Sequence, residues 1–460
     1  MINGKDAIRC ALLTCALFQC IWQAYADNDT SQDPPHEEEV VSDLDTDIAK
    51  ATAEIERDPS SGYFKRAVYL DQKMEFVRAL KDYAEAIRTG QAPRSYILRG
   101  ELWREMGESE LADQDFDEGL RRIDEFVRKD ARLEKLFHQE RAWALYAKGD
   151  AVKAIAELDK ALESELKPSL LLMRGIAWRR LGNLQKAEAD FDKVIELVPK
   201  HSSALCERGR LYAARGDFQR AFEDFSEGLR ADPNQPLIYT SRANAYLMLR
   251  QYDKAISDCS EAIKIVPLYA PAYRHRGCAR LALGNVDLAL NDFNQAVQFT
   301  PSYVKPGLCG RELFPLRGAR DRIHYYDFLP QLDRAGIWRM KGEWEKAIVD
   351  LKETLRMDPA STQAQNDLAW IQATCPDAKY RDGKSAIELA RKACEATKWK
   401  KDDFIVTLAA AHAENSEYDE AIKRLTQANE IDPKRDAATR ENLLNLFKQS
   451  MPFRESVKDK

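Results

Sequence analysis

The chain has 460 residues, of which 44% are hydrophobic and 32% are charged, and its formal net charge is −6 at pH 7. This composition is ordinary for a soluble helical protein, and it lacks the strong positive balance of a nucleic-acid-binding domain. Because there is no glycine-rich phosphate loop, nucleophile elbow or Cys-x-x-Cys motif, nothing in the sequence indicates a nucleotide-binding, hydrolytic or zinc site.

The segment 1–26 has the pattern of a secretory signal peptide. Lys5 and Arg9 make a weakly basic start, and residues 10–24 are uncharged and mostly apolar. This run is too short for a typical membrane-spanning helix, and Ala24-Tyr25-Ala26 fits the small-x-small pattern of a cleavage site. We therefore expect an exported chain cleaved after Ala26, with an uncleaved N-terminal anchor or a lipoprotein anchor as the alternatives.

Residues 27–49 carry most of the negative charge. They hold nine Asp and Glu residues, no Lys or Arg, two adjacent prolines and only four large aliphatic residues. This composition predicts a disordered acidic arm. Without the arm and the segment 1–26, which carries a net +1, the remaining residues 50–460 are left with about +2.

Residues 168–303 repeat one pattern, in which equivalent positions are separated by a constant spacing of 34. We number the repeat from position 1 at Pro168, which puts small residues at positions 8 and 20, large residues at 11 and 24, Gly at 15 and Pro at 32. In the first copy these are Gly175, Ala187, Trp178, Phe191, Gly182 and Pro199, and in the second Gly209, Ala221, Tyr212, Phe225, Gly216 and Pro233. A period of this kind predicts a helix–turn–helix solenoid.

Each repeated residue type has a physical reason. Small residues at positions 8 and 20 let two helices cross closely, and Gly at 15 permits the left-handed backbone that ends the first helix. Pro at 32 cannot continue the second helix. We therefore expect the position-20 alanines to be buried at the crossings: Ala187, Ala221, Ala255 and Ala289.

The same offsets fit copies on both sides of this block. The N-terminal part, residues 50–303, has earlier copies at 60–92, 93–126 and 135–167, and residues 48–59 fit an unpaired closing helix. Residues 304–327, rich in Gly and Pro, interrupt the period and predict an insert loop. The C-terminal part, residues 328–435, contains a variant copy at 362–400, and residues 436–460 predict a capping helix and a tail.

These motifs resemble the tetratricopeptide repeat (TPR) family, which implies an all-α, right-handed superhelical solenoid, here of about ten repeats. In the variant copy, Asn366-Asp367-Leu368-Ala369-Trp370 is followed by Ala373-Thr374-Cys375-Pro376 and Arg381-Asp382-Gly383. This copy resembles one found near the end of bacterial TPR proteins. The resemblance implies a bacterial chain, and an exported bacterial protein would be periplasmic or envelope-associated.

The resemblance also implies where a partner binds. In TPR proteins positions 2, 5, 9, 12 and 13 of the first helices point into the concave groove. In this chain such positions hold the following side chains: Trp143, Tyr146, Arg179, Arg180, Arg210, Asn244 and Arg274. Some TPR domains grip a peptide carboxylate with Lys, Asn or Arg there, but this chain has no Lys at the usual place. An anion-binding groove and a groove of scattered polar residues both remain open.

Histidine and cysteine give no sign of a metal or cofactor site. No two of the six histidines lie within helical reach of each other. Six cysteines follow the predicted signal peptide, and we expect them to pack as free thiols. In particular, Cys375 and Cys394 should lie near opposite ends of their helix pair, too far apart for a disulfide.

We expect a non-catalytic scaffold, without a cofactor, that binds a protein or peptide through the concave face. The alternatives are an envelope polysaccharide- or wall-binding protein and a non-catalytic regulatory subunit of an enzyme complex. We expect neither nucleic acid as a partner nor a membrane span after signal removal.

Overall fold

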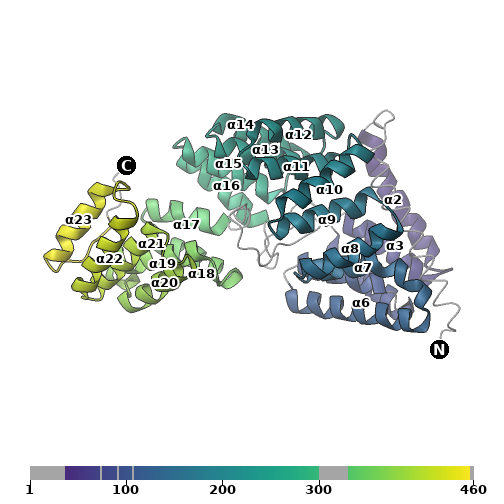
Figure 1. Ribbon diagram of the computed structural model, residues 1–460, viewed down its shortest axis with the longest axis horizontal. Coiled ribbons are helices and arrows are strands. Elements are labelled where there is room, and N and C mark those ends of the chain that lie inside the picture. The colour runs from purple at the N-terminus through teal and green to yellow at the C-terminus, as the bar shows by residue number, and fades with distance from the viewer. Residues whose placement is uncertain (1–36, 73–74, 91–92, 106–107, 300–329, 456–460) are drawn as a thin grey trace. The chain divides into compact units, whose positions relative to one another are not determined.

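The computed structural model describes residues 37–72, 75–90, 93–105, 108–299 and 330–455, and all regular structure in these ranges is helical (Figure 1). The chain forms two compact units. Within the described residues, unit 1 runs to His275 and includes Phe299, and unit 2 comprises residues 276–298 and 330–455. We describe each unit by itself.

Unit 1 contains these helices: α2 (Glu37–Glu54), α3 (Pro59–Gln72), α4 (Phe76–Gly90), α5 (Pro93–Glu105), α6 (Ser109–Lys129), α7 (Glu134–Ala147), α8 (Ala151–Ser164), α9 (Pro168–Arg180), α10 (Leu184–Leu197), α11 (Ser202–Ala214), α12 (Phe218–Ala231), α13 (Pro236–Met248) and α14 (Tyr252–Ile265). A 3₁₀ turn, η1 (Ala131–Leu133), precedes α7, and α15 (Ala270–Ala282) crosses the division between the units. Unit 2 continues with these: α16 (Val286–Phe299), α17 (Pro330–Met340), α18 (Trp344–Met357), α19 (Thr362–Thr374), η3 (Ala378–Tyr380), α20 (Gly383–Ala396), α21 (Asp402–Glu414), α22 (Tyr418–Ile431) and α23 (Ala437–Lys448).

Consecutive helices form pairs, from α3–α4 through α21–α22, so the described residues contain ten helix pairs. Within each unit, first helices pack on their own second helices, as α11 does on α12 and α21 on α22, and neighbouring pairs such as α9–α10 and α11–α12 also contact each other. The helix α23 packs on α22 at the C-terminal end, as expected for a capping helix. These observations confirm the predicted all-α solenoid of about ten repeats.

The helix crossings are built as the sequence predicts. Ala187, Ala221, Ala255 and Ala289 are all fully buried. At position 8, a Cβ on Gly209 would lie only 2.8 Å from Cε1 of Phe225, which occupies position 24. Four repeats combine Gly with Phe at these two positions, whereas the next repeat after Gly209 combines Ala243 with Cys259. The two positions are therefore matched in size, which keeps the crossing densely packed.

A glycine at position 15 ends the first helix with a left-handed backbone. The φ angle is +76° at Gly182 and +81° at both Gly216 and Gly284. Arg250 takes the same place with φ of +58°, at a cost of about 1–2 kcal/mol relative to a favoured conformation.

A ladder of ion pairs, which the sequence analysis did not anticipate, joins the two helices of most repeats. An Arg at position 7 pairs with an Asp at position 23 of the same repeat. Arg208 donates from Nε and Nη2 to the carboxylate of Asp224 at 2.9 and 2.7 Å. The same pair occurs seven times among the described residues: Arg66–Asp82, Arg99–Asp115, Arg174–Asp190, Arg208–Asp224, Arg242–Asp258, Arg276–Asp292 and Arg334–Asp350. These fork-like contacts are stronger than single neutral hydrogen bonds.

The N-terminal region differs from its prediction. Residues 37–49, predicted as part of a disordered arm, belong to α2, which packs on α3. Two features of the sequence explain this helix. Acidic residues at its start are favoured by the helix dipole, and Val40, Val41, Leu44 and Ile48 recur at helical spacing.

The predicted signal peptide, the first part of the arm and the 304–327 insert lie outside the described residues. No helix within the described residues is long and apolar enough to cross a membrane.

Candidate functional site

All seven predicted groove residues lie on first helices. Trp143 and Tyr146 belong to α7, Arg179 and Arg180 to α9, Arg210 to α11, Asn244 to α13 and Arg274 to α15. First helices of neighbouring repeats contact each other directly, as α9 does α11 and α11 does α13. Side chains at the same repeat position therefore follow one another from repeat to repeat.

Glu207 joins two of the predicted arginines. Arg179 Nε lies 3.0 Å from one carboxylate oxygen of Glu207, and Arg210 Nη1 donates to the other at 3.0 Å. Burial raises the pKa of Glu207, but the charges of Arg179 and Arg210 outweigh this effect and hold the pKa below its usual value. The carboxylate therefore stays ionised at neutral pH and balances much of the arginines' positive charge.

The sequence analysis missed Glu207 because it considered only the positions that usually contact ligands. Its place three residues before Arg210 on α11 was the available signal, since residues at this spacing are neighbours on a helix surface.

Arg180 and Tyr146 pack against each other between α9 and α7. Arg180 Nη1 donates to the Tyr146 carbonyl oxygen at 3.1 Å, and its guanidinium carbon lies 5.0 Å from the centre of the Tyr146 ring. Both residues are buried, and burial raises the pKa of Tyr146 to about 12. This cation–π contact ties neighbouring repeats together.

Polar contacts also connect α5 with α7. The indole N–H of Trp143 donates to the Glu101 carboxylate. Deeper in the same interface, Arg94 lies 3.4 Å from Glu140, and burial raises the pKa of Glu140 despite the attraction of Arg94. Of the remaining predicted residues, Asn244 is half-buried and Arg274 is buried.

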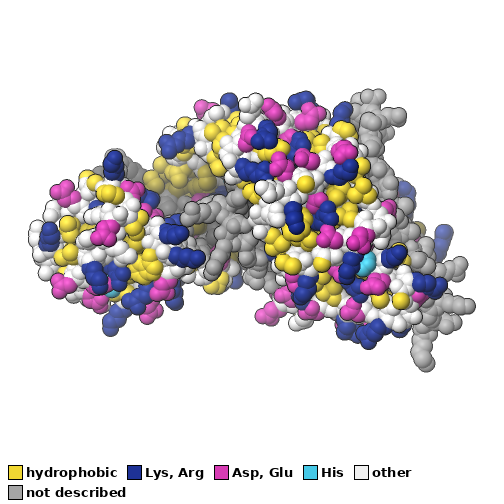
Figure 2. Space-filling model, in the orientation of Figure 1, with side chains coloured by type: hydrophobic (Ala, Val, Ile, Leu, Met, Phe, Trp, Pro, Cys, Tyr) yellow, Lys and Arg dark blue, Asp and Glu magenta, His cyan; other side chains and the backbone are white. Residues whose placement is uncertain are grey.

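We call Glu101, Trp143, Arg179, Glu207 and Arg210 the first-helix strip. It alternates acidic, aromatic and basic groups, and each of these side chains already contacts another member. Figure 2 shows the same mixture more widely, with Lys and Arg interspersed among Asp and Glu over the visible face of unit 1. Trp143 and Glu207 are buried, so the members of the strip that a ligand would reach are the partly exposed Glu101, Arg179 and Arg210.

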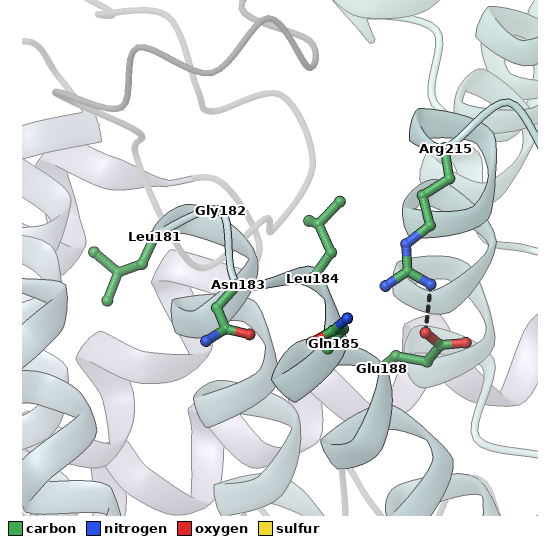
Figure 3. Close-up of a pocket in the computed structure, with 7 residues that line it drawn as sticks. All are labelled: Leu181, Gly182, Asn183, Leu184, Gln185, Glu188 and Arg215. Carbon is green, nitrogen blue, oxygen red and sulfur yellow. Dashed lines mark hydrogen bonds and ion pairs between the residues drawn. The ribbon is translucent and has the colours of Figure 1, made fainter.

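A shallow hollow of about 760 Å³ lies at the turn between α9 and α10 (Figure 3). Its polar lining is engaged within the chain, because Asn183 accepts a hydrogen bond from the Lys186 backbone and Arg215 pairs with Glu188. No three His, Cys, Asp or Glu side chains within the described residues are grouped to hold a metal ion.

The cysteines of the variant repeat lie apart. Cys375 and Cys394 are both fully buried free thiols, and they belong to different hydrophobic clusters of unit 2. Burial raises the pKa of Cys394 to about 12, which keeps this thiol protonated at neutral pH.

Comparison with known proteins identifies the repeat. A family model described as tetratricopeptide repeat matches residues 104–169, 172–236 and 240–304. These three segments are tetratricopeptide repeats. The TPR pattern continues on both sides of the matched segments, in α3–α4 and in α17 to α22.

Among curated proteins, tetratricopeptide repeat protein 16 of Homo sapiens is 31% identical over 117 residues, which are 24% of this chain and 13% of that protein. The chain thus matches only 13% of the length of the human and Macaca fascicularis relatives.

Two solved structures are similar. The APC/C hetero-tetramer Cut9–Hcn1 has a TM-score of 0.51 at 15% identity, over 84% of this chain and 76% of that chain. Yeast Tom70 has a TM-score of 0.42 at 14% identity, over 89% and 92% of the two chains. The first of these shares the TPR fold.

Proposed function

We propose that this TPR protein is an exported, non-catalytic scaffold that binds an extended segment of a partner protein along the concave face of unit 1. The observation that carries the proposal is the first-helix strip. Its charged and aromatic groups come from four successive first helices, α5, α7, α9 and α11, so an extended chain crossing them would meet at least one group at each. TPR proteins in general serve as interaction scaffolds, which supports the same function.

The pairing of Arg179 and Arg210 with Glu207 bears on the choice of ligand. A groove of unopposed arginines would attract any acidic segment. Here the buried carboxylate reduces that attraction, so we favour a partner segment of mixed charge with an aromatic residue. Recognition would then depend on hydrogen bonds and stacking at particular repeats, which favours specificity over general attraction to anions.

The proposal of export rests on the segment 1–26, with its basic start, short apolar run and Ala24-Tyr25-Ala26. If the chain is bacterial, as its variant repeat suggests by resemblance, the partner would be a protein of the periplasm or envelope.

A peptide-display selection on the full chain tests the binding function. The selected peptides are then measured against Trp143→Ala and Arg210→Ala, which remove an aromatic and a basic group from the strip. Lys193→Ala on the second helix α10 is the matched control, because Lys193 is partly exposed and pairs with its own helical neighbour Glu196.

We expect each strip variant to weaken binding at least about tenfold, as removal of a central interface residue does, while the control changes nothing. Peptides that bind all three variants equally well would refute the proposed site.

A further inference from the structure

The polypeptide after α23 lies against the first helices of unit 2. The backbone N–H of Glu455 donates to the Thr374 carbonyl oxygen at 2.8 Å, and the indole N–H of Trp370 donates to the Glu455 carboxylate at 3.0 Å. Arg339 of α17 lies 3.6 Å from the same carboxylate. We call residues 453–455 the tail segment; none of them belongs to a helix.

The side chains of Phe453 and Arg454, which precede Glu455, also contact unit 2. Arg454 pairs with Glu414 of α21 at 2.6 Å and donates to the Ala373 carbonyl oxygen at 3.4 Å. The Phe453 ring lies 6.0 Å from the Trp370 ring, at an angle of 48°. Each residue of the tail segment therefore has its own contact: an aromatic ring for Phe453, a carboxylate for Arg454, and donors for Glu455.

These contacts all fall on one surface. Trp370 stands at position 9 of its repeat, Arg339 and Ala373 at position 12, and Thr374 and Glu414 at position 13. Positions 9, 12 and 13 are the ones that the TPR resemblance assigns to ligand contact. They come from α17, α19 and α21, the first helices of three successive pairs. The tail segment thus lies where an extended ligand of a TPR array would lie.

A partner could displace the tail segment from this surface. Phe453, Arg454 and Glu455 are all half-buried, so water reaches their contacts. Only residues 449–452 separate the segment from the end of α23, and a short connection of this kind gives an effective concentration on the order of millimolar. An internal ligand at that concentration occupies the site by default and yields to a partner that binds more tightly.

We propose that the first-helix face of α17, α19 and α21 is a second peptide-binding site, which the chain's own tail segment occupies until a partner displaces it. The partner presents the same chemistry in an extended conformation: an aromatic residue, then Arg, then an acidic residue. This inference extends the proposed binding function to unit 2 and depends on none of the residues of the first-helix strip.

A fluorescent peptide of residues 449–455, with blocked ends, tests the proposal against the full chain. In the chain variant Phe453→Ala/Arg454→Ala, which we call the released chain, the tail segment loses the contacts of these two side chains. It keeps only those of Glu455 and therefore competes far more weakly for the site. We expect this variant to bind the peptide at least about tenfold more tightly than the unmodified chain does. Gln449→Ala, an exposed change next to the segment, is the control and should bind the peptide like the unmodified chain.

Changes on either side of the interface establish specificity. A peptide with Glu in place of its Arg should lose binding to the released chain, because its new carboxylate would lie against the carboxylate of Glu414 and be repelled by it. Adding Trp370→Phe to the released chain removes the donor to the peptide carboxylate and keeps an aromatic ring, and it should also weaken binding. Arg210→Ala in unit 1 should have no effect, so failure of the unit 1 proposal would not produce the same result.

The proposal is overturned if the released chain does not bind the peptide, or if the unmodified and released chains bind it equally. If the double change reduces the hydrogen-exchange protection of α19 and α21, the single variant Glu455→Ala is used in its place. This variant removes only the contacts of the Glu455 carboxylate. The same comparison of peptide affinities then decides the question.

Discussion

The size match between positions 8 and 24 predicts that Gly209→Ala destabilises the third and fourth helices of the central block, α11 and α12. Alanine is favoured over glycine within a helix by about 1 kcal/mol. The new Cβ, however, would lie 2.8 and 2.9 Å from two ring carbons of Phe225 and 3.2 Å from the Ala221 carbonyl oxygen. The Phe225 ring is fully buried and has no room to withdraw.

Overpacking of a dense core costs about 1–3 kcal/mol, which exceeds the gain in helix propensity. We expect a net destabilisation of up to about 2 kcal/mol, or a fall of up to roughly 30-fold in local protection. Hydrogen exchange of the α11 and α12 backbone amides is the suitable assay, because it reports each helix pair separately in a long repeat protein.

A second substitution tests the cause. Phe225→Leu removes the ring that the new Cβ meets, so Gly209→Ala in that background should be neutral or stabilising by up to about 1 kcal/mol. The two changes should therefore couple by about 1–3 kcal/mol. Gly336→Ala in α17 is the matched control, because its Cβ would meet no atom within 4 Å, and it should stabilise its helix. If Gly209→Ala is stabilising while Phe225 is present, the size-match explanation is wrong.

Three further predictions follow from the ion pairs and the N-terminal sequence. Glu207→Gln should lower the stability of α9 and α11 by about 3 kcal/mol at pH 7, because it leaves two largely buried arginines without their counter-charge. Since the folded pKa of Glu207 is depressed, thermal melts should show this difference shrinking as the pH falls below the carboxyl's ordinary value of about 4.5; a difference that stays constant or grows below that pH would contradict the assignment. Asp258→Asn should cost about 2 kcal/mol by breaking its paired contact with Arg242, whereas Asp253→Asn on the exposed side of α14 should stay within about 0.5 kcal/mol; equal protection of α13 and α14 in both variants would refute the role of the ladder. Mass spectrometry of the mature protein should find an N-terminus at Asp27, and a soluble chain that begins at Met1 would disprove export.

The sequence predicted the fold because the TPR pattern is local. Helix ends depend on residues such as Gly182 and Pro199, and the close crossings depend on small residues at fixed offsets, so the period of the sequence carries both. The α2 helix was not predicted because the acidic composition was given more weight than the helical spacing of Val40, Leu44 and Ile48. The packing of α2 on α3 stabilises this segment as a helix.

The candidate site was only partly predictable, because its contacts join separate helices. The sequence indicated that Arg179 and Arg210 belong to the first-helix surface, but only the packing of α9 on α11 brings Arg179 to Glu207, which Arg210 reaches from its own helix. The tail segment is a stronger example: the helices α22 and α23 separate Arg454 from Glu414 along the chain, and no local pattern relates the two residues. Periodicity identifies the elements, and three-dimensional packing determines which charges meet.

The binding of a partner protein on the first helices can be tested directly. The direct measurement places a photo-crosslinking amino acid at Asn244, which stands at position 9 of α13 in the line of the strip, or at the partly exposed Lys193 of α10. Irradiation of cells that export each variant should yield a crosslinked partner from position 244 and none from position 193. A partner captured from position 193 alone would contradict the claim and move the binding site to the second helices.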